Sequence, residues 1–242
     1  MLRDNEPGRI NRFLHPSIYK EGDDAVVVTP NGGAKLYWYV LKNYFFQLVG
    51  VGLLSVLLSL PLVTIPATRT AISRVCMKLC LEGYGSVYSE FFGEWKTAIL
   101  RTLPFGILSG VPAAAGLFVL YLALTGQEVG TFYLIVSGVV VLLLFLLTSY
   151  GYPLLALIDL PTPTNLKNAV FLAGSQLGAN LRLLIPLVVT AIGLLLLPLS
   201  LPVLLLLFVP GPALMRAVIV KQPIETLIIR PFLEQGDSAA RE

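Results

Sequence analysis

Long apolar runs separated by short polar stretches make up most of the chain after its first 40 residues. A helix needs about 20 apolar residues, each rising about 1.5 Å, to cross a hydrocarbon core about 30 Å thick. Three runs have this length, and a fourth of about 38 residues is long enough for two crossings, joined where the prolines of "PLSLP" break a helix. We therefore expect about five transmembrane helices. They are residues 44–65, 103–125, 131–152 and two helices within 183–220.

Three connecting segments have the periodicity of amphipathic helices but too little apolar length to cross a membrane. In the first, Arg69, Arg74 and Lys78 lie opposite an apolar side, and in the second, Glu90 and Glu94 lie opposite an aromatic side. We expect each to lie in the headgroup region with its apolar face toward the hydrocarbon. The segments are residues 65–81 and 88–101, between spans one and two, and residues 166–177, between spans three and four.

The pattern predicts an all-α integral membrane protein with one transmembrane domain, residues 41–230, between a polar leader, 1–40, and a polar tail, 231–242. Basic residues occur in the amphipathic segments and the tail, whereas the turns at 126–130 and 198–202 contain none. We therefore expect a multi-pass protein of the plasma membrane. The positive-inside rule places those segments and the C-terminus on the cytoplasmic side of that membrane. The leader is also basic, and the side of the N-terminus stays open.

Composition supports this class, because the mean hydropathy is +0.81 and only 13% of residues are charged. The net charge of +3 is dispersed, so we expect membrane lipids and no nucleic acid as partners. Only His15 is available to complete a zinc site with Cys76 and Cys80, so we expect no metal site and two buried, reduced thiols.

The sequence lacks the residue patterns that nucleotide binding or catalysis would require. There is no G-x-x-x-x-G-K-[ST] loop for nucleotide phosphates, and the predicted spans hold no acid or histidine pair for proton transfer. We therefore expect no enzyme, no catalytic residue and no cofactor.

Two groups of side chains are candidates for interaction. The aromatic stripe of the second amphipathic segment is either a partner surface or an interfacial anchor. Small residues at spacing four in the second span let another helix approach, from this chain or from a partner. The stripe is Phe91, Phe92 and Trp95, and the small residues are Gly106, Gly110 and Ala114.

The end of the first span, "LPLVTIPAT", followed by "FFGEWK" and "YGYPLLALIDLPTPTN", resembles the YesL-like family of bacterial membrane proteins, whose domain is of unknown function. The matching junction residues are Leu60, Pro61, Val63, Thr64, Ile65 and Pro66. This resemblance implies an accessory role in sugar uptake and possible partners among the subunits of a carbohydrate ABC importer.

A different function stays open, that of a small facilitator for an uncharged solute, which needs no buried charge. Its path would be lined by polar side chains between kinked helices. Those side chains would be Gln47, Ser55, Ser59, Thr148 and Ser149.

Overall fold

The computed structural model describes residues 32–82, 86–158, 161–196 and 210–229. Within these ranges the chain forms seven α-helices and no strand, which confirms the all-α fold class. The helices are α2 (Gly33–Leu58), α3 (Ile65–Glu82), α4 (Val87–Leu124), α5 (Thr131–Leu157), α6 (Thr162–Ser175), α7 (Leu177–Leu196) and α9 (Pro210–Ile224). A 3₁₀ turn, Leu62–Thr64, leads into α3, and a π-helical turn, Glu225–Ile229, follows α9.

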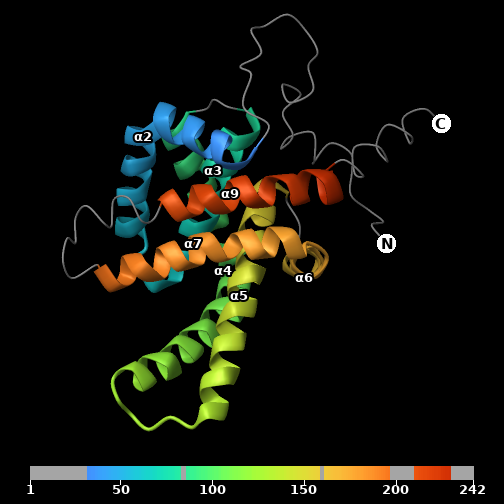
Figure 1. The fold of residues 1–242 in the computed structure, drawn as a ribbon. Coiled ribbons are helices and arrows are strands. Elements are labelled where there is room, and N and C mark those ends of the chain that lie inside the picture. Colours follow the sequence, from blue (N-terminus) through green and yellow to red (C-terminus); the bar gives the residue numbers. More distant parts are fainter. Residues whose placement is uncertain (1–31, 83–85, 159–160, 197–209, 230–242) are drawn as a thin grey trace, which may run out of the picture.

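Helices α4 and α5 form a hairpin whose closed end projects from the other helices (Figure 1). Gly126 turns the chain after α4 with a φ of +81°, a conformation that glycine adopts without steric cost. The projecting half carries large apolar side chains that are exposed, a surface typical of a helix facing lipid. These side chains include Ile107, Leu108, Val111, Leu117, Phe118, Phe132, Ile135, Val139 and Leu143.

Three described helices, α2, α4 and α5, are long and apolar enough to cross a membrane. The pair α6 and α7, bent by 99° at a short break, would add a fourth span if it crosses as one broken helix. The chain thus has the helix lengths and composition of a multi-pass membrane protein. The predicted fifth span falls partly within residues 197–209, outside the described residues.

The first predicted span differs in detail from α2. The helix begins at Gly33, and Leu36 and Val40, from the predicted polar leader, are completely buried in the core. It is kinked at Tyr44, where the predicted span begins, and it ends at Leu58.

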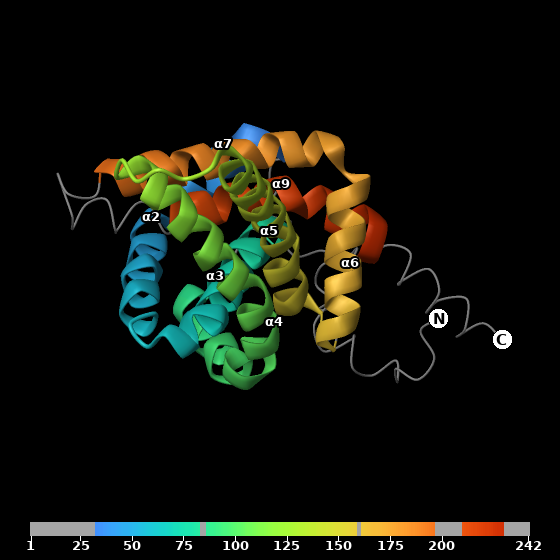
Figure 2. The same cartoon turned by 90° about the horizontal axis from the view of Figure 1, so that it is seen from below.

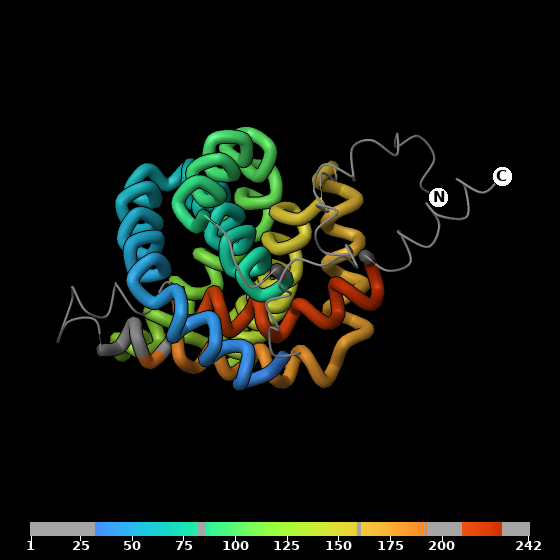
Figure 3. Tube along the Cα trace, turned by 90° about the horizontal axis from the view of Figure 1, so that it is seen from above, coloured from blue at the N-terminus to red at the C-terminus, as the bar shows by residue number. Residues whose placement is uncertain are grey.

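Helix α3 lies at the centre of the structure, packed against α2, α4, α5 and α9 (Figure 3). The sequence predicts a surface helix with a single apolar face, but the structure buries α3 on most of its sides. The reason is that Arg74 and Lys78, on its polar side, face the charged side of α4 rather than water. Buried residues of α3 include Ala71, Ile72, Val75, Cys76, Met77, Leu79 and Cys80.

The second amphipathic segment is also not a separate helix. It is the first part of α4, which continues through Pro104 and Pro112 over 38 residues. At about 1.5 Å per residue this helix is nearly twice as long as a span needs, so its first half packs on α3 and its second half projects. Beyond the hairpin, α7 lies beside α9, and α6 turns sharply away from α7 (Figure 2).

Candidate functional site

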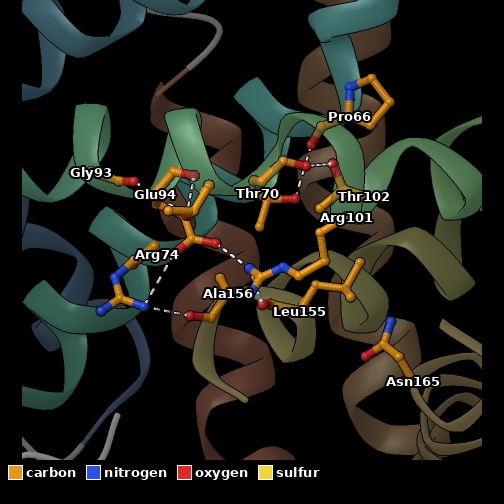
Figure 4. A network of polar contacts seen from close by, with 12 residues as sticks. Pro66, Thr70, Arg74, Gly93, Glu94, Arg101, Thr102, Leu155, Ala156 and Asn165 are labelled. Carbon is orange, nitrogen blue, oxygen red and sulfur yellow. Dashed lines mark hydrogen bonds and ion pairs between the residues drawn. The ribbon is translucent and has the colours of Figure 1, made fainter. Parts of the chain in front are cut away.

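Five charged side chains from α3 and α4 form a network beside the end of α5. Figure 4 shows three of them, Arg74, Glu94 and Arg101. Glu94, only 6% exposed, lies between two guanidinium groups. Arg74 Nη1 is 3.3 Å from one Glu94 carboxylate oxygen, and Arg101 Nη2 bonds the other. Glu90 accepts hydrogen bonds from Arg74 Nε at 3.1 Å and from Lys78 Nζ at 2.6 Å. We call Arg74, Lys78, Glu90, Glu94 and Arg101 the polar clamp.

The clamp also holds the backbone of α5. Arg74 Nη1 donates to the carbonyl oxygen of Ala156, and Arg101 Nη2 donates to that of Leu155, each at 2.9 Å. Both carbonyls lie in the last turn of α5, where a helix has no intrahelical donors for them and where positive charge is favourable. The clamp therefore ties the end of the projecting hairpin to the central helices.

The spacing of the charges explains why the network forms. Arg74 and Lys78 are four residues apart on α3, and Glu90 and Glu94 are four apart on α4, so each pair shares one helix face. Because α3 and α4 pack along each other, the two faces of opposite charge meet. The sequence shows these residues on polar faces, but it does not show that the faces point at each other.

The clamp is better suited to holding helices than to chemistry. A general base needs a carboxylate oxygen that can reach a substrate proton. Both oxygens of Glu94 and both oxygens of Glu90 accept bonds from arginine or lysine. Proton transfer would first require one of these bonds to break.

A second polar cluster lines a partly open cavity of about 30 Å³ between α3, α5 and α9. Arg69 of α3 and Arg216 of α9 bring two positive charges to it, and Thr148, Ser149 and Tyr152 of α5 bring hydroxyl groups. We call this cavity, lined by these five residues, the basic cavity. The sequence places Arg216 near the end of a span and Arg69 on a surface helix, with no signal that brings the two together.

The predicted aromatic stripe does not form one exposed face. Phe91 is completely buried in the core and Trp95 packs against the core, whereas Phe92 is 37% exposed. Tyr88, one turn earlier on α4, is 45% exposed, and its hydroxyl lies against Gly50 of α2. The accessible aromatic residues here are therefore Tyr88 and Phe92, and the partner surface predicted at Phe91, Phe92 and Trp95 stays a prediction.

The junction motif connects α2 to α3. Leu60 and Val63 are exposed. The Thr64 hydroxyl lies 2.7 Å from the Pro61 carbonyl oxygen and also within hydrogen-bonding reach of the Leu58 carbonyl oxygen. Thr64 thus bonds carbonyl oxygens at the end of the first span, which is a structural role.

The small residues of α4 have different neighbours. Gly106 touches Pro66 of the junction so closely that a Cβ there would lie 2.0 Å from the Pro66 Cγ. Gly110 has open space where a Cβ would be, and Ala114 is exposed. Gly116, outside the predicted stripe, instead packs closely against α5. Packing within this chain thus uses Gly106 and Gly116.

Cys76 and Cys80 are both free and buried, as predicted. Burial raises the pKa of both thiols, to about 12 for Cys80, although the nearby Lys221 acts in the opposite direction on that residue. The thiols therefore stay protonated at neutral pH and behave as small apolar groups. The predicted absence of a metal site also involves His15, which lies outside the described residues.

No family model, curated protein or solved structure matches the chain. The resemblance to the YesL-like family therefore stays a prediction.

Proposed function

We propose that the chain is a non-enzymatic multi-pass membrane protein that serves carbohydrate uptake as an accessory or interaction component. The single observation that carries the membrane part is the α4/α5 hairpin, whose projecting half exposes large apolar side chains over its length. The role in carbohydrate uptake is supported by the resemblance of residues 60–66 to the YesL-like family. Its partners are membrane lipids and subunits of a carbohydrate ABC importer.

The proposed arrangement has about five spans, with the connecting segments and the C-terminus in the cytoplasm. The basic residues of those segments support this orientation. The polar clamp then lies at the cytoplasmic base of the hairpin, where it sets the angle at which the hairpin leaves the central helices.

The proposed partner surface is the exposed aromatic pair Tyr88 and Phe92 at the start of α4. Aromatic side chains contribute much of the binding energy at protein interfaces because they bury large area with little loss of conformational freedom. Phe91 and Trp95 support this surface from below by packing into the core.

A pull-down of the tagged protein in mild detergent, followed by mass spectrometry, tests the proposal. Importer permease subunits should be recovered with the native chain and lost with Tyr88→Ala/Phe92→Ala. Phe118→Ala is the matched control, because Phe118 is an exposed aromatic on the projecting half of the same helix. Recovery of no importer subunit with the native chain would overturn the proposed role, and equal losses in the control would overturn the proposed surface.

One observation bears on the facilitator alternative. Thr148 and Ser149, two of the five residues predicted to line a path, do line the basic cavity. Its volume of about 30 Å³ holds about two water molecules, far less than the roughly 300 Å³ of ordinary ligand pockets. Flux of a labelled sugar into liposomes containing only the purified chain would support this alternative over the accessory role.

A further inference from the structure

The two arginines of the basic cavity differ from those of the polar clamp in having no carboxylate partner among the described residues. The Arg69 guanidinium lies 5.9 Å from the centre of the Tyr152 ring and makes no hydrogen bond with the described part of the chain. Arg216 donates only from Nε, to the Pro212 carbonyl oxygen at 3.2 Å, and its guanidinium lies over a phenylalanine ring. Most of their N–H donors are therefore left for a ligand.

Electrostatics favour an anion between them. Arg69 and Arg216 line the same small cavity, so their positive charges repel each other. Two like charges beside one partly enclosed cavity are costly unless a negative charge offsets them. The cavity is partly open, so an anion can enter it from the surface.

The hydroxyl groups narrow the choice of anion. Thr148 and Ser149 already donate to the carbonyl oxygen of Phe145, at 3.1 Å and 2.7 Å. Tyr152 is different, because it is only 5% exposed, lines the cavity and has a hydroxyl without a hydrogen-bond partner among the described residues. Two guanidinium groups and a phenol O–H from three helices suit a tetrahedral anion, which presents acceptor oxygens in several directions.

The position of the cavity along α5 also favours a tetrahedral anion. Residues 148–153 follow the exposed apolar part of α5 after the half-buried residues 144–147, at the level where the hairpin enters the central helices. If the projecting half lies in hydrocarbon, this level is the headgroup region, where phosphate groups are concentrated.

We propose that the basic cavity binds a phosphate group, held by Arg69, Arg216 and the Tyr152 hydroxyl. The phosphate comes from a lipid headgroup or from a free phosphate, which use the same donors. This proposal requires the chain to be a membrane protein only for the lipid source, and it does not depend on a role in carbohydrate uptake.

The test measures binding to the full-length purified protein in detergent by native mass spectrometry. The probes are short-chain phosphatidic acid, a lipid of equal chain length without a phosphate group, and inorganic phosphate at matched ionic strength. Arg69→Gln is the main variant, because Arg69 is exposed and its replacement leaves the core intact. Arg182→Gln, an exposed arginine of α7 outside the cavity, is the matched control for loss of one charge.

Phosphatidic acid should bind to the native protein and to Arg182→Gln with equal affinity, and about tenfold or more weakly to Arg69→Gln, since a charge-assisted hydrogen bond is lost. Tyr152→Phe, which keeps the ring, should weaken binding by less and leave the melting temperature unchanged. Binding of inorganic phosphate with the same dependence on Arg69 identifies a free phosphate as sufficient, and binding of the lipid alone identifies the headgroup as the source.

Two results would overturn the proposal. One is equal affinity of the native protein and Arg69→Gln for both phosphate probes. The other is equal binding of the phosphate-free lipid, because the acyl chains and not the phosphate would then account for the association.

Discussion

Replacing Glu94 by glutamine is the most direct perturbation of the polar clamp. Glutamine has nearly the same shape, so packing is kept while the negative charge between Arg74 and Arg101 disappears. Both arginines stay next to the α5 carbonyls, but their charges are no longer offset by Glu94. We expect the free energy of unfolding to fall.

The size of the effect follows from burial. Removing one partner of a fully buried ion pair costs about 3–5 kcal/mol, and exposed pairs contribute about 0–1 kcal/mol. The Glu94 side chain is 5% exposed, and its partners Arg74 and Arg101 are 22% and 24% exposed. The two guanidinium groups thus regain some water, which places the expected loss at about 2–3 kcal/mol. For a chain of this size that corresponds to a fall in melting temperature of roughly 4–12 °C.

The assay is a thermal scan of the detergent-purified protein, monitored by tryptophan fluorescence at a fixed heating rate. Glu128→Gln is the matched control, since it makes the same chemical change at an exposed position between α4 and α5. It should alter stability by less than about 0.5 kcal/mol. Combining Glu94→Gln with Arg101→Gln should cost less than the sum of the single changes. Equal melting temperatures for Glu94→Gln and Glu128→Gln would refute this account of the clamp.

Two further predictions concern the close packing of Gly106 and the burial of the two thiols. Gly106→Ala should lower stability by about 1–3 kcal/mol, because its Cβ would overlap Pro66, whereas Gly110→Ala should have almost no effect; comparison of their melting temperatures checks this. Cys76 and Cys80 should react with a maleimide at neutral pH only after unfolding, because they are buried and their pKa values are raised; rapid labelling of the folded protein, followed by mass spectrometry, would contradict this.

The length of the apolar runs was sufficient to predict the α4/α5 hairpin. Apolar length alone predicts spans at 103–125 and 131–152. The second lies within α5, the first ends one residue beyond the last residue of α4, and the turn follows at Gly126. The prolines at 104 and 112 do not end α4, however. An isolated sequence pattern cannot show that neighbouring elements support a helix through proline.

The sequence pattern did not predict which residues that lie far apart along the chain contact each other. The charges of α3 indicate a headgroup-facing side if α3 is considered alone, but they pair with Glu90 and Glu94 of α4. Similarly, Phe91 and Phe92 both belong to an aromatic segment, and only packing decides that the first is buried and the second exposed. The same limit applies to Arg69 and Arg216, which meet at one cavity from opposite ends of the domain.

The central claim, that the α4/α5 hairpin crosses the membrane, is tested most directly by single cysteines at its two ends. Gln127 lies in the exposed turn between α4 and α5, and Lys167 is exposed on α6, beyond the other end of α5. The account predicts that a membrane-impermeant maleimide labels Gln127→Cys in intact cells and labels Lys167→Cys only after the membrane is disrupted. The buried Cys76 and Cys80 should give no background. Labelling of both positions from the same side of the membrane would contradict the crossing.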